Sequence, residues 1–240
     1  IEVDSFDLPV TKAYIDNIRK RGVRVLYPTK WLNGLVVSTP EPDSARILLF
    51  SWYVDKAIYL GKSRGRWTGK PSGKSEGESA LNASSIESDT ETYGKALDQI
   101  SMIRGLPIHH MGKRGSGMRI AVFDEGFYKV DRLSIFKHLI ENNRIKGTYD
   151  LVDMDGDVFK DGDHGMKVLS CLAGSLKGKM TGTAPDANYF LFRTEDNTSE
   201  YLIEELNWIR AAEMADSIGV DIINSSLGYT TFDDKSMNHK

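Results

Sequence analysis

The sequence predicts an α/β fold, a mostly parallel sheet with helices on both faces, preceded by a small α+β unit. From Lys95 onward, short apolar segments typical of strands alternate with amphipathic segments typical of helices. The segment MRIAVFD is the clearest apolar strand, and parallel sheets are buried on both faces. Residues 1–60 follow a different order of patterns, and a Gly- and Ser-rich stretch separates them from the rest. The chain therefore divides into two folded units.

Residues 1–60 begin with one amphipathic helix, because Val10, Tyr14, Ile15 and Ile18 recur at helical spacing and Gly22 follows. The next patterns predict two strands over residues 23–29 and 31–39, a second helix over 42–50 and a last strand over 54–60. This order is that of a ferredoxin-like split unit that lacks its first strand. We expect that strand to lie upstream.

Residues 61–93 are rich in Gly and Ser and show no sustained periodicity, which predicts a flexible linker. Five basic residues stand near its start, at positions 62, 64, 66, 70 and 74. They are compatible with nucleic-acid binding, but a solvated linker with protease-sensitive sites is the preferred interpretation.

Residues 94–240 form the larger unit. Strands are predicted over residues 118–124, 147–153, 187–195 and 220–228, and helices over 133–140, 164–174 and 199–219. This alternation favours a parallel sheet covered on both faces. Ligands of such sheets bind at the carboxyl ends of the strands, so the residues that follow 118–123 and 220–225 are the first candidates for a site.

Composition and charge exclude several classes of protein. Apolar residues make up 40% of the 240 and 22 residues are glycine, a share typical of globular chains and not of disordered ones. With 31 basic and 34 acidic residues the net charge is −3, so no overall field attracts nucleic acid, and no nucleic-acid partner is expected. The longest apolar run, Ile47–Val54, is interrupted by Ser51 and is too short to span a membrane. Cys171 is the single cysteine, which excludes an internal disulfide.

Two polar residues of the larger unit point to acid–base chemistry. Asp124 closes the apolar strand of IAVFDEGF, and His164 opens the helix of DGDHGMKVLSCLAG. A buried carboxylate that accepts a hydrogen bond from one imidazole nitrogen fixes the tautomer, and the other nitrogen can then act as a general base. Each residue alone could also be structural, Asp124 as a cap and His164 as an ordinary surface residue. Together they predict two members of a catalytic triad.

Four motifs in this order resemble the N-terminal half of a subtilisin-like serine protease. GKRGSGMRIAVFDEGF resembles the aspartate motif of that family, DGDHGMKVLSCLAG the histidine motif, GTAPDANYFLF the Gly-x-Ala-Pro loop, and GVDIINSSLGY the substrate-binding strand. The resemblance implies that Asp124 orients the histidine, that His164 is the base, and that Ser226, Leu227 and Gly228 form the edge that pairs with extended substrate. It also implies polypeptide substrates, secretion or a cell-surface location, no required cofactor, and a possible structural calcium.

The same resemblance extends more loosely to residues 1–60, which are similar to the inhibitory propeptide of the family. The chain's own propeptide is therefore an expected partner of the larger unit. We expect the maturation cleavage between Arg64 and Glu91. No signal peptide precedes this unit, so either it was removed or the numbered chain is a piece of a longer one.

Three features depart from the family pattern. Met166 stands where threonine is usual, and Glu125 stands where a small hydroxyl residue is common; we expect Glu125 to point to solvent. The nucleophilic serine of a Gly-Thr-Ser motif and the oxyanion asparagine would follow the substrate strand, beyond Lys240. We therefore expect a truncated catalytic domain, inactive alone, because loss of the serine lowers turnover by about 10⁶. Its sheet would end on an unpaired, apolar edge that favours aggregation.

Two other functions stay open. A degenerate, non-catalytic subtilase would still bind extended peptides along residues 226–228. A metal-dependent hydrolase would use Asp124, Asp163 and His164 as ligands. The acidic loop DMDGDVFKDGD fails the EF-hand pattern, because its sixth and twelfth positions hold Val158 and His164. A solvated acidic loop is the preferred interpretation of that segment.

Overall fold

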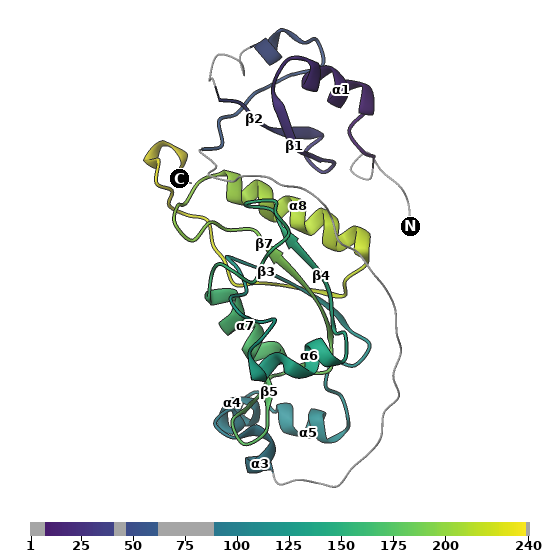
Figure 1. Ribbon diagram of the computed structural model, residues 1–240, viewed down its shortest axis with the longest axis vertical. Helices are drawn as coiled ribbons and strands as arrows, with labels where there is room; N and C mark the ends of the chain where they lie inside the picture. Colours follow the sequence, from purple (N-terminus) through teal and green to yellow (C-terminus); the bar gives the residue numbers. More distant parts are fainter. Residues whose placement is uncertain (1–7, 41–46, 62–88, 239–240) are drawn as a thin grey trace.

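The computed structural model describes residues 8–40, 47–61 and 89–238 (Figure 1). Three parts follow one another along the long axis of the molecule in Figure 1. They are an N-terminal unit, a parallel sheet with its covering helices, and a group of short helices at the opposite end from the N-terminal unit. Among the described residues, no helix is both long and apolar enough to cross a membrane.

The N-terminal unit, residues 8–61, contains α1 (Lys12–Lys20), β1 (Arg24–Thr29), β2 (Gly34–Ser38) and the 3₁₀ helix η1 (Ile47–Phe50). β1 and β2 pair in an antiparallel hairpin, and its small core is formed by Ile18, Val23 and Leu48. The first helix and the two strands are where the sequence predicts them.

Two predictions for this unit were wrong within the described residues. The helix expected from residue 42 is a single 3₁₀ turn at Ile47–Phe50, and residues 41–46 lie outside the described part. The strand expected over residues 54–60 is not formed. This segment has no strand partner, and the carbonyl of Leu60 instead accepts a hydrogen bond from the amide of Ile203, 3.0 Å away. The described part is therefore a two-stranded unit and does not complete a ferredoxin-like sheet.

Residues 62–88 of the predicted linker lie outside the described residues. Its last five residues form the helix α3 (Asp89–Tyr93), and α4 (Leu97–Met102) and α5 (Gly105–His110) follow. Tyr93 is buried, and its hydroxyl lies 2.8 Å from Nδ1 of His109. These short helices were not predicted, because each is only five or six residues long and shows no sustained apolar period.

The sheet is parallel, as predicted. Its four strands are β3 (Arg119–Asp124), β4 (Ile145–Asp150), β7 (Asn188–Arg193) and β8 (Ile222–Ser225), in the spatial order β4-β7-β3-β8. A separate hairpin joins β5 (Ser175–Leu176) and β6 (Met180–Thr181). β8 has a strand neighbour on one side only among the described residues, and Ile222 and Ile223 are 48% and 40% exposed. Aggregation at this edge stays a prediction.

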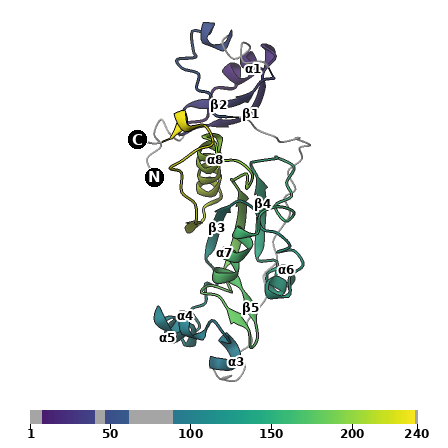
Figure 2. The same ribbon diagram turned by 90° about the vertical axis from the view of Figure 1, so that its left-hand side faces the viewer.

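Helices cover both faces of the sheet (Figures 1 and 2). One face packs against α7 (His164–Ala173) and the segment of η2 (Ser134–Phe136) and α6 (Lys137–Glu141), and the other face packs against α8 (Ile203–Ile218). Along β3, Ile120 and Val122 belong to the first core, while Ala121 and Phe123 belong to the second. Burial of both faces explains why β3 has no polar residue between Arg119 and Asp124.

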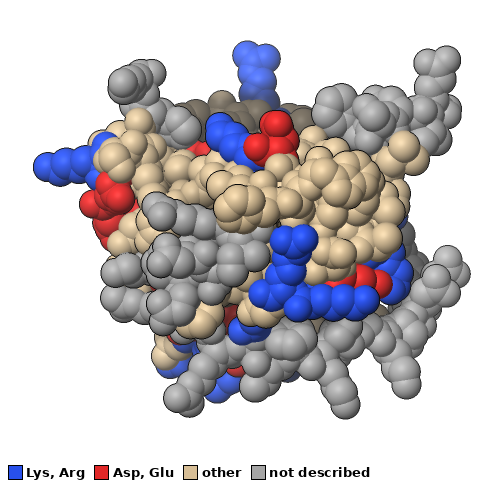
Figure 3. Space-filling model, turned by 90° about the horizontal axis from the view of Figure 1, so that it is seen from above, with Lys and Arg blue, Asp and Glu red and all other residues tan. Residues whose placement is uncertain are grey.

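The N-terminal unit lies on the outer side of α8 (Figure 1). The Tyr27 hydroxyl donates to Oδ1 of Asn207 (2.8 Å), and the carboxylate of Glu213 accepts from the Thr29 hydroxyl (2.5 Å) and the Trp31 amide (3.0 Å). Tyr27, Thr29, Asn207 and Glu213 are all buried, so the two units share a closed polar interface. Viewed from above, the outward end of the molecule shows basic and acidic side chains among uncharged surface (Figure 3).

Candidate active site

Asp124 is held at the carboxyl end of β3, the edge at which parallel sheets bind ligands. Its side chain is completely buried. Oδ1 accepts the amide proton of Glu125 at 2.9 Å, which fixes the orientation of the carboxylate. The carboxylate of Asp124 is therefore a hydrogen-bond acceptor with a fixed orientation at the edge of the sheet.

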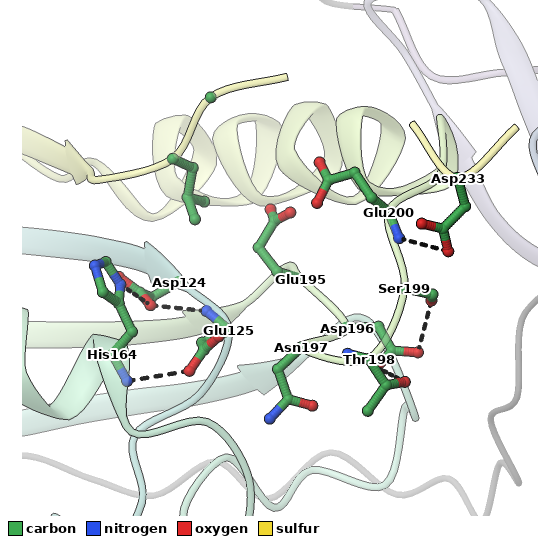
Figure 4. Close-up of a pocket in the computed structure, with 12 residues that line it drawn as sticks. Asp124, Glu125, His164, Glu195, Asp196, Asn197, Thr198, Ser199, Glu200 and Asp233 are labelled. Atoms are coloured by element: carbon green, nitrogen blue, oxygen red, sulfur yellow. Dashed lines mark hydrogen bonds and ion pairs between the residues drawn. The ribbon is translucent and has the colours of Figure 1, made fainter. Parts of the chain in front are cut away.

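His164 is the first residue of α7, and its imidazole meets this carboxylate. Nδ1 lies 2.8 Å from Oδ1 and 3.1 Å from Oδ2 of Asp124 (Figure 4). The His164 side chain is 50% exposed, whereas that of Asp124 is 0% exposed. The acid is thus withdrawn from water while Nε2 of the imidazole stays available for a further partner. The two residues that the sequence predicts as an acid–base pair do lie together.

Glycines allow the start of α7 to approach the end of β3 this closely. A Cβ on Gly165 would lie 2.4 Å from the carbonyl oxygen of Gly126 and 2.7 Å from Cβ of Asp124. A Cβ on Gly126, whose φ is +147°, would lie 2.0 Å from the carbonyl oxygen of Asp161. A side chain at position 165 would push α7 away from the end of β3, and one at position 126 would displace the loop before α7.

Glu125 does not simply point to solvent, contrary to the prediction. Its carboxylate accepts the amide proton of His164 at 3.1 Å (Figure 4). This amide belongs to the first turn of α7, where amides have no partner within the helix and negative charge is favourable. Glu125 therefore caps the helix that carries the imidazole.

The electrostatic environment of Asp124 reflects its burial. Desolvation raises the pKa of Asp124 above its ordinary value, and the hydrogen bonds from His164 and from the Glu125 amide act in the opposite direction. Because the ionised carboxylate loses its water, it depends on these two donors. A protonated imidazole beside it would be stabilised in turn.

A pocket opens beside this pair (Figure 4). It is lined by Asp124, Glu125 and His164, by the loop of residues 195–200 that follows β7, and by Leu227, Gly228 and Asp233. Two of the three residues predicted to bind substrate, Leu227 and Gly228, therefore face the same pocket as the acid–base pair. Ser226 is not among the lining residues, and its hydroxyl accepts a hydrogen bond from the side-chain Nδ2 of Asn224 at 3.2 Å. The substrate-binding role of residues 226–228 stays a prediction.

Glu195, Glu200 and Asp233 were not identified from the sequence. Glu195 follows β7 at the carboxyl edge of the sheet, where polar residues could have drawn attention. Its carboxylate accepts from the Thr194 hydroxyl (2.8 Å) and from the Tyr229 hydroxyl. Burial raises the pKa of Glu195 to about 7. The contact with Tyr229 links the loop after β7 to the segment after β8 across the pocket.

The acidic loop DMDGDVFKDGD, residues 153–163, is not simply solvated, contrary to the prediction. Arg193, which is 4% exposed, donates to Oδ2 of Asp153 (2.7 Å) and to the carbonyl of Glu125 (3.1 Å), and it pairs with Asp150. Lys160 pairs with Asp153, Asp155 and Asp161. The two cations offset part of the negative charge of this loop, and Arg193 ties it to the residue that follows β3.

The residues offer a poor fit to a catalytic metal. Asp163, the third ligand of the metal-hydrolase alternative, pairs with Lys167 at 2.8 Å instead of joining Asp124 and His164. Among the described residues, Glu195, Glu200 and Glu204 each offer one oxygen within 4.8 Å of the others. Both oxygens of Glu204 already accept backbone amides, from Asp196 (2.8 Å) and Tyr201 (3.3 Å). Few oxygens remain for a cation such as Ca²⁺, which takes six to eight.

Comparisons with known proteins agree with this geometry. Residues 1–73 match the family model described as "Peptidase S8 propeptide domain, Bacteroidota", and residues 115–240 match the model described as "Subtilase family". No curated protein sequence matches the chain. The second match covers more than half of the 240 residues and includes both Asp124 and His164. The chain therefore belongs to the subtilase family of serine peptidases and carries a propeptide ahead of its catalytic unit.

Proposed function

We propose that this chain supplies the acid and the base of a serine endopeptidase that hydrolyses polypeptides through an acyl-enzyme. The observation that carries the proposal is the 2.8 Å contact between Nδ1 of His164 and the buried carboxylate of Asp124. With Nδ1 engaged, Nε2 is the nitrogen that would take a proton from a hydroxyl nucleophile.

In this mechanism the serine hydroxyl attacks the peptide carbonyl while Nε2 of His164 accepts its proton. Asp124 stabilises the imidazolium that results and keeps the ring in place. His164 then returns the proton to the leaving amine, which releases the first product and leaves the acyl-enzyme. Water, deprotonated by the same nitrogen, hydrolyses the ester and restores the serine. The reaction requires no cofactor.

We propose that the nucleophile and the oxyanion-stabilising asparagine come from polypeptide beyond Lys240. The sequence holds the aspartate and histidine motifs but no Gly-Thr-Ser motif. Residues 1–240 alone would then hydrolyse nothing measurable. The propeptide match and the buried contacts of Tyr27 and Thr29 with α8 support a zymogen whose own propeptide is its first partner. Secretion or display at the cell surface is part of this proposal.

The test compares residues 1–240 with a longer polypeptide from the same reading frame. We expect fluorophosphonate labelling and casein hydrolysis for the longer polypeptide alone. His164→Ala in the longer polypeptide should lower kcat by a factor of about 10⁴ to 10⁶. Lys167→Ala, one turn further along α7 and exposed, is the matched control and should retain activity.

Robust, serine-inhibitor-sensitive hydrolysis by residues 1–240 would overturn the proposed origin of the nucleophile. If the longer polypeptide binds peptides but neither reacts with fluorophosphonate nor hydrolyses casein, the non-catalytic peptide-binding module is the better description.

A further inference from the structure

The pocket beside His164 carries unbalanced negative charge. Besides the acid–base pair, it is lined by the carboxylates of Glu125, Glu195, Asp196, Glu200 and Asp233. No Lys or Arg is among the residues that line it in the described part of the chain. The other acidic cluster of this unit, residues 150–161, has Arg193 and Lys160 as built-in counter-ions. The pocket therefore lacks the basic counter-ions that the fold places beside the other acidic cluster.

Three of these carboxylates already have structural partners. Glu125 accepts the amide of His164, Asp196 accepts from Thr198 and Ser199, and Asp233 accepts the amide of Glu200 at 3.4 Å. These contacts shape the walls of the pocket. Glu125 and Asp233 use only one oxygen each, as Glu195 does, and no described residue donates to either oxygen of Glu200.

Of Glu195 and Glu200, Glu195 is the more informative. It is only 7% exposed, yet it lines the pocket between the acid–base pair and Glu200 (Figure 4). Its Oε1 accepts two hydroxyl protons, from Thr194 and Tyr229, whereas no described residue donates to Oε2. No described residue donates to the carboxylate of Glu200 either. A buried carboxylate oxygen without a donor is unfavourable. Because this oxygen faces an open pocket, a bound ligand with an N–H or O–H group could donate to it.

Burial, together with neighbouring negative charge, raises the pKa of two carboxyl groups here. Burial raises the pKa of Glu195 to about 7 and that of Glu204, which packs behind it, to about 8. The neighbouring carboxylate of Glu200 adds to both shifts. A cation placed among these groups would reverse the effect, because it favours their ionised forms.

The N-terminal unit comes close to this place at its last described residues. The Leu60 carbonyl accepts the Ile203 amide, and a Cβ on Gly61 would lie 2.6 Å from the Tyr201 side chain. The N-terminal unit therefore ends against the first turn of α8, next in sequence to Glu200 and Glu204. The residues that follow Gly61 lie outside the described part, but their sequence, KSRGR, holds three cations and no acid.

We propose that this pocket is a specificity site for a cationic side chain, Arg or Lys, of the polypeptide substrate, with Glu195 and Glu200 as its recognition groups. The inference rests on the proposed peptidase function and adds the substrate class. A guanidinium offers several N–H donors in one plane and suits the vacant oxygens of two neighbouring carboxylates. A single cationic group needs only these two carboxylates.

The test measures kcat/KM of the longer polypeptide from the same reading frame on fluorogenic peptides that contain YLGKSRGRW. In matched peptides each Arg is replaced by citrulline, its neutral isostere, and Lys by norleucine, one position at a time. We expect one position at which removal of the charge lowers kcat/KM by about tenfold or more. Glu200→Gln and Glu195→Gln should each reduce the ratio of kcat/KM for the charged peptide to that for the neutral peptide severalfold. Glu141→Gln, on the exposed surface of α6, should leave this ratio unchanged.

Equal kcat/KM for charged and neutral peptides at every position would overturn the inference while leaving the peptidase function intact. A preference that survives both substitutions at Glu195 and Glu200 would also overturn it. If millimolar Ca²⁺ raises the melting temperature of the unmodified protein but not of the Glu200→Gln variant, and abolishes the peptide preference, the pocket is a metal site instead.

Failure of the proposed function has a different signature, namely no hydrolysis of any peptide. In that case the same peptides, labelled with a fluorophore, are titrated into the 240-residue chain and binding is followed by anisotropy. Tighter binding of the charged peptide by about tenfold, lost in Glu200→Gln, supports the inference without catalysis. Equal binding of charged and neutral peptides refutes it.

Discussion

Replacing Glu213 by alanine should detach the N-terminal unit from α8. The carboxylate is 1% exposed and accepts three donors, the Thr29 hydroxyl at 2.5 Å, the Trp31 amide at 3.0 Å and the Arg210 guanidinium at 3.3 Å. Alanine would leave the Thr29 hydroxyl and the Trp31 amide without their acceptor in the interface. A buried donor without a partner costs about 1 to 3 kcal/mol, so the two together cost about 2 to 6 kcal/mol.

Urea unfolding of the 240-residue chain measures this loss, and amide hydrogen exchange over residues 27–31 locates it. We expect a lower free energy of unfolding together with faster exchange in β1 and the turn after it. Glu141→Ala is the matched control, because Glu141 is 60% exposed and its pair with Lys137 at 3.3 Å should contribute less than about 1 kcal/mol. Glu213→Gln keeps an acceptor oxygen, so its free energy of unfolding should fall less than that of Glu213→Ala.

Two results would refute this reasoning. One is a Glu213→Ala variant that unfolds within about 0.5 kcal/mol of the Glu141→Ala control, a difference typical of ordinary surface substitutions. The other is a destabilised variant in which exchange over residues 27–31 does not change, since the carboxylate would then act only within α8.

Three further predictions concern the catalytic unit. Gly165→Ala should cost about 1 to 3 kcal/mol in urea unfolding and remove the downfield NMR signal of the His164 Nδ1 proton, because the added Cβ meets Gly126 and Asp124; an unchanged signal would contradict this. Arg193→Met should cost about 3 to 5 kcal/mol, since it leaves buried Asp150 unpaired, while exposed Lys160→Met should cost less than about 1 kcal/mol. Glu195→Gln should flatten the pH dependence of stability: the raised pKa of Glu195, about 7 against 4.5, makes the protonated form favourable, so its contribution is complete below about pH 4.5 and lost as the pH rises through 7. The unmodified protein should therefore lose up to about 3 kcal/mol more than the variant between pH 4 and pH 8, and parallel curves would contradict this.

The acid–base pair was predictable because each of its members lies in a local pattern. Asp124 ends a uniformly apolar segment, and His164 opens an amphipathic one. The carboxyl edge of a parallel sheet then brings the two together from positions 40 residues apart. The strands and covering helices of the sheet were predicted for the same reason, because the period of the apolar residues is local and strong.

The acidic pocket was not predictable, since its residues come from four separate segments and become neighbours only in the folded chain. Glu195, Glu200 and Asp233 show no shared spacing, and each resembles an ordinary surface acid. Glu125 was assigned to solvent because no sequence pattern shows that its carboxylate reaches the His164 amide. The strand expected over residues 54–60 has the right composition, but a strand also needs a neighbour, and this segment has none among the described residues.

The acidic loop between β4 and α7 is hydrogen-bonded through its second half to the segment that follows β3. The amides of Phe127, Tyr128 and Lys129 donate to the carbonyls of Val158, Gly162 and Phe159, and Arg193 bridges the loop to Glu125. Insertions and deletions are usually tolerated in exposed loops, but a change of length here would shift the register of these bonds and move Asp124 relative to His164. Related sequences should therefore keep the length of this loop constant.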